Sequence, residues 1–282
     1  MDKNGKLLIA AIQLDSQADK QANLETARGF IEEAAVRGAQ LVAMPECMNY
    51  IGDSELENAE PIPGPTTDFF SELAKRLNIW IHCGSIDEKI PGSEKAYNTN
   101  VLIDPFGKIF SKYRKLHMFD VVIENGPSYK ESDTIEPGSE IVLAKTELAT
   151  LGFSICYDIR FPEIYRLMAL NGAQIIFAPA AFVMNTGKDH WEPILRARAI
   201  ENACYIVAPG QIGIKPKLQA YGKSLIVDPW GNVIAKASDR PGFILSEIDL
   251  SLIEKTRAQV PALNNRRDDI YSIGSTQIKI YE

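Results

Sequence analysis

Leu151-Gly-Phe-Ser-Ile-Cys156-Tyr-Asp-Ile-Arg160-Phe-Pro-Glu163 is the stretch of sequence that decides both the fold and the chemistry of this chain. A short β-type run ends in Cys156, and Pro162 suits the first turn of a helix, where a missing N–H costs nothing. A cysteine at such a strand-to-helix turn faces free backbone N–H groups, which lower the pKa of a thiol and prepare an oxyanion site. The stretch therefore predicts a nucleophile elbow. The alternative is a buried strand cysteine that packs as a small hydrophobe.

The length and composition of the chain indicate one globular domain. It has 282 residues, of which 45% are hydrophobic, and this is enough to bury a full core. No linker, low-complexity tract or internal repeat is evident, so we expect residues 1–282 to form a single domain, with its core at about 7–271 and a C-terminal tail at 272–282. The net charge of -7 argues against a nucleic-acid partner. No apolar run approaches the length of a membrane span, so we expect no membrane partner.

The cysteine pattern predicts a reduced, cytoplasmic protein. Four cysteines lie far apart, each in or beside an apolar run, and they are Cys47, Cys83, Cys156 and Cys204. Without a C-x-x-C or another paired spacing, neither a disulfide framework nor a zinc site is supported, and we expect no metal. The first residues, Met1 to Lys6, contain no apolar signal region.

Apolar periodicity along the chain indicates strands that alternate with helices. We expect strands at 7–14, 41–44, 79–86, 98–103, 175–178, 205–208 and 243–248, and helices at 22–37, 66–77, 163–170 and 191–202. Two Asp-Pro-aromatic-Gly turns, 104–107 and 228–231, read as hairpins. This order favours an α/β sandwich with mixed sheets. A doubly wound nucleotide fold would need a G-x-G-x-x-G at its first helix, and residues 15–22 contain no glycine.

A cysteine nucleophile needs a base, and the usual one is histidine. His82 lies inside an apolar strand run and is expected in the core. His190 precedes Trp191 at an expected helix start, where a capping or packing role is natural. His117 is a candidate for an indirect role, in which it contacts a residue that in turn contacts the reacting groups. A Cys–His pair stays open as the alternative, but none of the three histidines is favoured.

A carboxylate base fits the pattern better. Glu46 directly follows the strand 41–44, and catalytic groups collect at the carboxyl ends of strands in such sheets. Lys115 supplies a positive charge among apolar neighbours and can stabilise an oxyanion together with the Tyr157 backbone N–H. Taken singly, Glu46 would be an exposed loop acid, and Lys115 would belong to a solvated basic cluster.

Together these segments resemble the nitrilase superfamily of carbon–nitrogen hydrolases, whose catalytic triad is Glu–Lys–Cys. The resemblance runs from about Leu7 to Tyr271 and is carried, in order, by Pro45-Glu46, Tyr113-Arg114-Lys115 and Cys156-Tyr157-Asp158. It implies that Glu46 is the general base, Lys115 the oxyanion stabiliser and Cys156 the nucleophile. It also implies a four-layer α-β-β-α sandwich, no cofactor, and a homodimer or higher even oligomer.

A second glutamate of the family matches Glu131 in Tyr129-Lys-Glu131-Ser, so we expect Glu131 to be catalytic as well. It lies in a segment with Gly126, Pro127, Pro137 and Gly138, which indicates a loop placed over the pocket. A mobile loop acid is the alternative.

The run from Cys156 to Glu163 looks like the amidase branch that contains ω-amidases and deaminated-glutathione amidases. That branch implies hydrolysis of a small carboxylate-bearing ω-amide, an α-ketoacid amide or deaminated glutathione, to the acid and ammonia through a thioester. Arg160 is a natural clamp for the carboxylate, because a guanidinium binds it bidentately; an ion pair with Glu163 or Asp158 is the alternative. Three further residues are assigned to the substrate pocket, namely Phe182, Thr186 and Tyr50.

Two other functions remain open at this stage. An N-carbamoyl-amide hydrolase resembling β-ureidopropionase would use the same triad. An inactive scaffold or binding protein on the same fold would have lost a triad residue, and all three are present.

Overall fold

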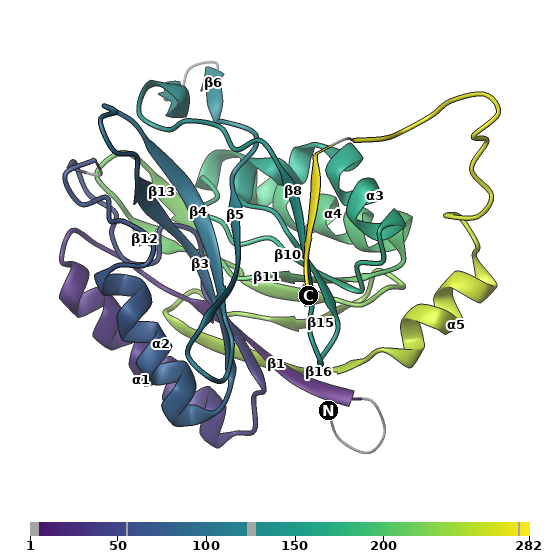
Figure 1. Ribbon diagram of the computed structural model, residues 1–282, viewed down its shortest axis with the longest axis horizontal. Coiled ribbons are helices and arrows are strands. Elements are labelled where there is room, and N and C mark those ends of the chain that lie inside the picture. Colours follow the sequence, from purple (N-terminus) through teal and green to yellow (C-terminus); the bar gives the residue numbers. More distant parts are fainter. Residues whose placement is uncertain (1–5, 55, 123–127, 276) are drawn as a thin grey trace.

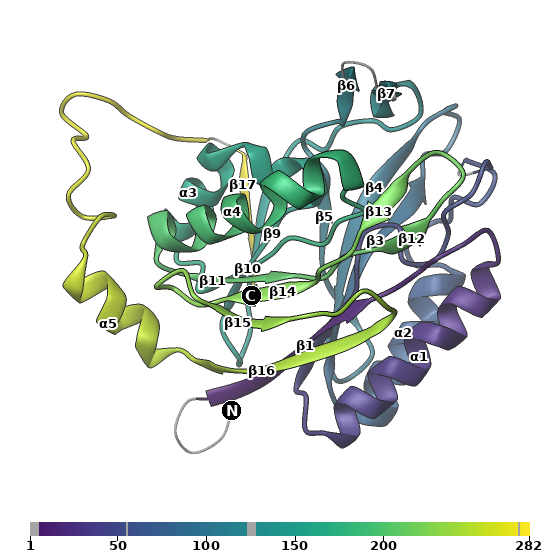
Figure 2. The ribbon, with the colours of Figure 1, turned by 180° about the vertical axis from the view of Figure 1, so that it is seen from behind.

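Two mixed β-sheets pack face to face, and helices cover their outer faces (Figure 1). The computed structural model describes residues 6–54, 56–122, 128–275 and 277–282. The expected α-β-β-α sandwich is confirmed, and the same layers are visible from behind in Figure 2. Residues 1–5, where no signal region is expected, lie outside the described residues, as do Gly126 and Pro127 of the expected loop.

The first sheet has six strands in the order β16-β1-β2-β3-β4-β5. Its strands are β1 (Lys6–Gln13), β2 (Leu41–Ala43), β3 (Trp80–Lys89), β4 (Ala96–Ile103), β5 (Ile109–Arg114) and β16 (Gly242–Asp249). β1, β2 and β3 are parallel, while β4, β5 and β16 are joined by antiparallel pairings. The first expected hairpin therefore joins β4 to β5 as predicted.

The second sheet has seven strands in the order β15-β14-β11-β10-β9-β8-β17. Its strands are β8 (Ile141–Lys145), β9 (Thr150–Phe153), β10 (Ile175–Phe177), β11 (Tyr205–Ala208), β14 (Leu225–Val227), β15 (Val233–Lys236) and β17 (Ile278–Tyr281). β9, β10 and β11 are parallel, and the second expected hairpin joins β14 to β15. Both sheets are mixed, as the hairpins indicate.

Five α-helices and two short 3₁₀ helices are present in the described part of the chain. They are α1 (Lys20–Val36), α2 (Pro65–Leu77), α3 (Pro162–Leu170), α4 (Met184–Asn202), α5 (Ser251–Gln259), η1 (Glu131–Asp133) and η2 (Cys156–Arg160). Two small ribbons complete the fold: β6 (Asp120–Val122) with β7 (Ser128–Lys130), and β12 (Ile212–Ile214) with β13 (Gln219–Tyr221). None of the described helices is long and apolar enough to cross a membrane.

Successive side chains of β1 point to opposite faces of the sheet, so this strand packs both against the other sheet and against the outer helices. Ile9 and Ala11 belong to the cluster between the sheets, whereas Ala10 and Ile12 pack with the buried faces of α1 and α2. Both faces are covered, so the strand reads as a continuous apolar run. Each buried aliphatic side chain of this kind contributes about 1.5–3 kcal/mol.

One expected helix start is wrong. α4 begins at Met184 and not at Trp191, so His190 lies inside the helix. Gly187 and Pro193 lower the helix propensity of this segment, but the burial of Trp191 and Leu195 in the core outweighs it. α2 begins at Pro65, one residue before the expected start, with Gly64 as its N-cap.

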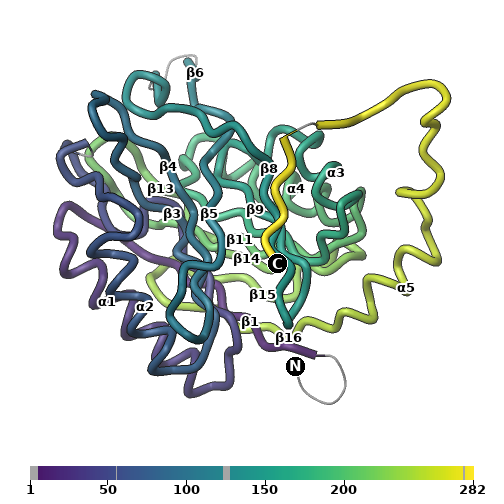
Figure 3. The backbone as a smooth tube through the Cα atoms, viewed as in Figure 1, coloured from purple at the N-terminus to yellow at the C-terminus, as the bar shows by residue number. Residues whose placement is uncertain are grey.

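The expected tail at 272–282 contains a strand. β17 pairs in parallel with β8 at the edge of the second sheet, and Figure 3 shows the two running side by side. β8, β17 and α5 have no counterpart among the expected elements.

Glu88, in β3, is expected to make the fold sensitive to acid. Burial would raise its pKa, but hydrogen bonds from Arg114, Lys112 and Thr99 lower it from 4.5 to about 2. A folded-state pKa below the unfolded value contributes stability that is present above about pH 4.5 and is lost as the pH falls towards 2. The full contribution is on the order of 3 kcal/mol.

Glu88→Gln should therefore lower the melting temperature at neutral pH and flatten its decline in acid. Thermal unfolding followed by circular dichroism between pH 6 and about pH 3 measures this. The same change at the exposed Glu72 is the matched control. Parallel pH profiles for wild type and Glu88→Gln would contradict the assignment.

Candidate active site

The topology brings the ends of several strands to one edge of the sandwich. Glu46 follows β2, and Lys115 directly follows β5, which runs in the same direction as β3 because two antiparallel pairings separate them. Cys156 follows β9 in the facing sheet, and Ala181 follows β10. Residues separated by up to 135 positions are thereby in contact.

Glu46 is held by an irregular stretch of β3. The pairing of β3 with β4 shifts register between Cys83 and Ile86, and the backbone of Gly84 approaches the chain just before Glu46. A Cβ atom at Gly84 would lie 1.9 Å from the carbonyl oxygen of Pro45, so only glycine allows this approach. Ser85 then accepts hydrogen bonds from the backbone N–H groups of Cys47 and Met48.

Cys156 occupies a strained turn, as the elbow predicts. Its φ of 47° lies in the left-handed region, which is unusual for a residue other than glycine. Its N–H donates to the carbonyl of Pro179 at 2.8 Å, and the Asp158 carboxylate accepts from the Ile155 N–H at 2.8 Å. η2 starts at Cys156 and α3 follows with Pro162 in its first turn. No described residue accepts a hydrogen bond from the Tyr157 N–H, which lies in the first turn of η2.

Lys115 lies between two carboxylates. Its Nζ is 2.9 Å from Glu46 Oε1 and 2.8 Å from Glu131 Oε1. The Ala181 N–H donates to Glu46 Oε2 at 2.7 Å, and the Phe119 N–H donates to Glu131 Oε2 at 2.6 Å. Glu46 and Lys115 are both buried. The expected lysine and both expected glutamates therefore form one charged cluster.

The pKa of the Cys156 thiol in this cluster differs from the one that the sequence predicts. Burial, and then the charge of Glu46, raise the pKa of Cys156 well above its usual value, although Lys115 opposes them. The expected lowering of the thiol pKa is wrong, because the turn is buried beside a carboxylate. Burial would also raise the pKa of Glu46, but Lys115 and the Ala181 N–H hold it below the usual value. These shifts favour a neutral thiol beside an ionised Glu46 in the resting site.

The same contacts keep the amine of Lys115 protonated. Burial would lower its pKa, but the charges of Glu131 and Glu46 raise it well above its usual value. One cation therefore faces two anions and a thiol in a site that is shielded from water.

A cavity of about 510 Å³ opens onto this cluster. Glu46, Lys115, Glu131 and Cys156 all line it. The ribbon β6–β7 stands beside it, at the top of Figures 1 and 2, and its residues 128–130 form part of the wall. Aromatic side chains form another part, since the Phe119 ring centre lies 5.2 Å from that of Tyr157. The volume suits a small organic molecule.

Some of the expected substrate-binding residues reach the cavity and others do not. Phe182, Thr186 and Tyr157 line it, and Thr186 Oγ1 is buried with no hydrogen-bond partner among the described residues. Arg160 lies outside the lining, with its guanidinium carbon 5.4 Å from the ring centre of Phe182 and 5.8 Å from that of Tyr157. Tyr50 is buried beside the cavity and accepts a hydrogen bond from the Ser54 N–H.

His82 lies in the core and His117 near the site, as expected, whereas His190 lies inside α4. His82 is buried between the sheets, and burial lowers its pKa to about 3. His117 Nδ1 lies 2.8 Å from Asp158 Oδ1, so it contacts the Cys156 turn through Asp158. His190 Nδ1 lies 3.4 Å from Arg160 Nη1. The charged group that most raises the pKa of the Cys156 thiol is Glu46 and not a histidine.

Several residues that line the cavity are not among those expected from the sequence. They are Asn98, Phe119, Tyr129, Lys130 and Lys215, all of which line the cavity. Asn98 donates to Glu46 from the interior of β4, where an asparagine reads only as an interruption of an apolar strand. Phe119 and Tyr129 lie close in sequence to Lys115 and Glu131, but the family resemblance assigns neither of them a role.

Three comparisons with known proteins agree with this geometry. A family model described as carbon-nitrogen hydrolase matches residues 8–258. The deaminated glutathione amidase of Synechocystis sp. is 40% identical over 265 residues, which cover 92% of this chain and 97% of that protein. The human omega-amidase NIT2 is 38% identical over 268 residues, which cover 94% and 96%.

A solved structure is similar as well. Nit3 of Saccharomyces cerevisiae, described as a member of branch 10 of the nitrilase superfamily, superposes with a TM-score of 0.82 at 34% identity. The match covers 93% of this chain and 97% of Nit3.

Proposed function

The chain belongs to the carbon–nitrogen hydrolase family and hydrolyses amide bonds, and from that premise we propose how its site works and on what. Cys156 is the nucleophile, Glu46 the general base and Lys115 the oxyanion stabiliser. The observation that carries this assignment is that the Cys156 thiol and a glutamate paired with Lys115 line the same cavity.

In the first step, Glu46 takes the thiol proton as the sulfur attacks the amide carbonyl carbon. The raised pKa of Cys156 keeps the proton on sulfur until the carbonyl is in place, so transfer and attack occur together. Protonation removes the negative charge of Glu46, and the charge of Lys115 is then available to the developing oxyanion. The Tyr157 N–H is the second donor.

In the second step, the proton passes from Glu46 to the amide nitrogen, the carbon–nitrogen bond breaks and ammonia leaves. A thioester on Cys156 remains. Water then gives a proton to Glu46 and attacks the thioester carbon, which releases the acid and returns the proton to sulfur. Glu131 keeps Lys115 charged and oriented throughout. The steps use these side chains and water.

The substrate class we propose is a small ω-amide that carries a distant carboxylate. The names of the two amidase relatives support it, and so does the size of the cavity. Arg160 is the proposed clamp for the carboxylate, because it lies beside Tyr157 and Phe182, which line the cavity wall. Tyr50 packs against Gly52, another residue of the cavity lining. The hydroxyl of Thr186, which has no partner among the described residues, is available to bond a polar group of the substrate.

Arg160→Lys is expected to raise KM for a carboxylate-bearing amide about ten- to a hundredfold, since a charged hydrogen bond contributes roughly 1.5–3 kcal/mol and lysine lacks the planar fork. Steady-state ammonia release measures the change. A neutral amide of equal size is the control and should lose much less. Equal losses for both amides would mean that Arg160 only supports the wall.

One release assay tests the function itself. Purified protein is given ω-amides of α-ketoacids, deaminated glutathione, N-carbamoyl acids and nitriles, and ammonia is measured. We expect turnover of the first two. Preference for the N-carbamoyl acids would favour a hydrolase of the β-ureidopropionase type, which uses the same triad. The expected cytoplasmic location stays a prediction, and all four cysteines are free thiols.

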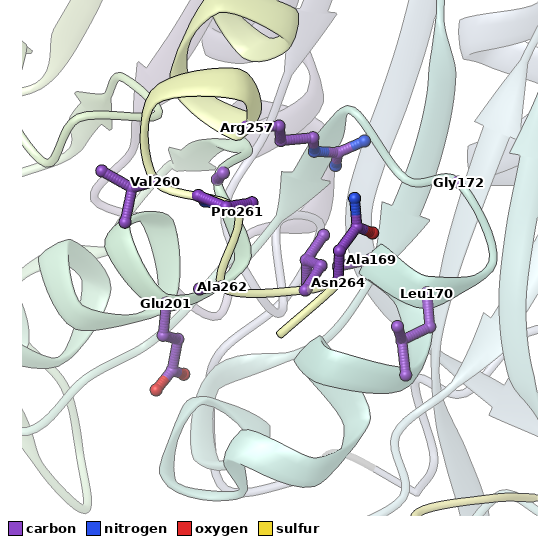
Figure 4. A pocket seen from close by; sticks show the side chains of 11 residues that line it. Ala169, Leu170, Gly172, Glu201, Arg257, Val260, Pro261, Ala262 and Asn264 are labelled. Atoms are coloured by element: carbon purple, nitrogen blue, oxygen red, sulfur yellow. The ribbon is translucent and has the colours of Figure 1, made fainter. Parts of the chain in front are cut away.

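We also propose that two copies of the chain associate through the face formed by α4 and the β14–β15 hairpin. Ile200 and Trp230 are 53% and 51% exposed there, and Gly231 lies against Ile200. The segment 260–275 runs outward beyond α3 in Figures 1 and 2 and carries the exposed Ile270 and Tyr271. Where it leaves α5, Val260 and Asn264 line a second cavity of about 270 Å³ together with Glu201 and Arg257 (Figure 4). Such a face suits a partner surface.

Trp230→Glu is expected to convert a dimer into a monomer, because a buried unpaired charge disfavours association. Light scattering coupled to gel filtration measures the mass. Phe106→Glu is the matched control, since Phe106 is 77% exposed at the equivalent position of the other Asp-Pro-aromatic-Gly hairpin. A wild-type monomer, or dissociation of both variants alike, would contradict the assigned face.

A further inference from the structure

Asn98 contacts all three charged residues of the site, the two glutamates through its side chain and the backbone N–H of Lys115 through its own backbone. Its Nδ2 donates to Glu46 Oε1 at 2.9 Å and to Glu131 Oε1 at 3.5 Å. Its backbone carbonyl accepts from the Lys115 N–H at 2.9 Å. Asn98 is 3% exposed and lines the cavity. One residue of β4 therefore joins the two glutamates and the lysine.

The chemistry of the carboxylates determines how the amide of Asn98 is oriented. An ionised carboxylate only accepts hydrogen bonds, so the end of the amide that faces Glu46 and Glu131 must be the NH₂ group. The oxygen Oδ1 is then directed elsewhere, and it is buried without a partner among the described residues. A buried acceptor without a partner disfavours folding. The residue is therefore better explained by what its NH₂ group does than by a contribution to stability.

The two carboxylates carry more negative charge than one lysine neutralises. The NH₂ group of Asn98 places partial positive charge against Glu46 Oε1 and Glu131 Oε1, the same two oxygens that accept from Lys115. It also limits the orientation of Glu46. Oε1 is engaged by Asn98 and Lys115, and Oε2 by the Ala181 N–H, which leaves the carboxylate one way to face the Cys156 thiol.

We propose that Asn98 is a positioning residue for amide hydrolysis, holding Glu46 and Glu131 in the arrangement in which Glu46 is ionised and aimed at the Cys156 thiol. The inference rests on the proposed function of Glu46 as the base. An enzyme that turns over but shows no Asn98 effect would refute only this inference, whereas a wild-type protein that releases no ammonia would refute the proposed function.

Asn98→Ala is expected to lower kcat about ten- to a hundredfold, the effect of losing a hydrogen bond to a charged group, with KM changed much less. Asn98→Ser keeps one donor and should recover part of the loss. When kcat is plotted against pH, its fall on the acid side should begin at a higher pH. The reason is that Glu46 loses a hydrogen-bond donor that favours its ionised form. The other ionisable groups that face Glu46 are Lys115, Glu131, Cys156, Cys47 and Asp87.

Asn100 provides the matched control. It lies two residues further along β4, on the same face, and it is equally buried with an unpartnered Oδ1. Its Nδ2 bonds Gly84 O at 2.8 Å and His82, and Asn100 does not line the cavity. Asn100→Ala should lose stability in thermal unfolding without the fall in kcat or the pH shift.

Three results would overturn the inference. The first is a kcat near wild type in Asn98→Ala. The second is the same fall in kcat and the same pH shift in Asn100→Ala, which would indicate a general effect of disturbing β4. The third is a raised KM with kcat unchanged, which would make Asn98 a contact for bound substrate.

Discussion

Cys156→Ala is expected to abolish amide hydrolysis, by a factor on the order of 10⁴ or more, while the protein remains folded. The thiol is the only side chain that bonds to the substrate carbon in the proposed mechanism, so no other side chain replaces it. The substitution removes one sulfur atom from a turn that is held by backbone hydrogen bonds, above all from the Cys156 N–H to Pro179 at 2.8 Å. Ammonia release measures the rate, and circular dichroism measures the fold.

Cys47 is the other candidate for the nucleophile. It also lines the cavity, and its φ of 51° also lies in the left-handed region. Mass spectrometry of the acyl-enzyme trapped with substrate should place the thioester on Cys156. Cys204→Ala is the control for the loss of a buried thiol outside the cavity. A thioester on Cys47, or turnover retained by Cys156→Ala, would overturn the assignment of the nucleophile.

Glu46→Gln and Lys115→Met are each expected to cost about 10³-fold or more in kcat, and the double variant little more than either alone. Glu46→Gln keeps the shape of the side chain but cannot take the thiol proton, and general base catalysis contributes about 10²–10⁴-fold. Lys115→Met removes the cation that meets the oxyanion, which contributes about 10²–10³-fold. When two groups act on one reacting centre, removing either one already loses most of their joint contribution. The losses in kcat of the two single variants therefore do not add in the double variant.

Stability has to be measured beside the rate for Lys115→Met. Without the lysine, Glu46 and Glu131 are left as uncompensated buried carboxylates, which destabilises a fold by about 3–5 kcal/mol. Lys115→Met combined with Glu131→Gln removes one of these charges and should recover stability without recovering the rate. A kcat near wild type in folded Lys115→Met would contradict the oxyanion role. Additive losses in the double variant would contradict a shared reacting centre.

Local physics was sufficient for much of the fold. The strands β1, β10 and β11 and the two Asp-Pro-aromatic-Gly hairpins follow from apolar runs and from turn residues, which act within a few positions of each other. The same holds for the turn that carries Cys156, since a β run followed by Pro162 specifies a strand-to-helix change locally. Assembly of Glu46, Lys115 and Cys156 was expected from their places after strands and from the family resemblance.

Expectations failed where the deciding contact is distant in sequence. α4 starts seven residues early because packing of Trp191 into the core outweighs the weak helix propensity of the residues before it. The place of Arg160 also depends on distant packing: it lies beside Tyr157 and Phe182 and not in the cavity lining itself, and its role as the carboxylate clamp stays a prediction. Asn98 had no local signal, because its role depends on two carboxylates that lie 52 and 33 residues away.

The sequence by itself determined which residue types are available for the chemistry and which local turn presents the thiol. Only the tertiary structure decided their protonation. The turn alone would lower the pKa of Cys156, but burial and the charge of Glu46, contributed by the opposite sheet, raise it. Desolvation and Coulomb interactions depend on distance in space and on water access, and neither quantity is encoded in the spacing of residues along the chain.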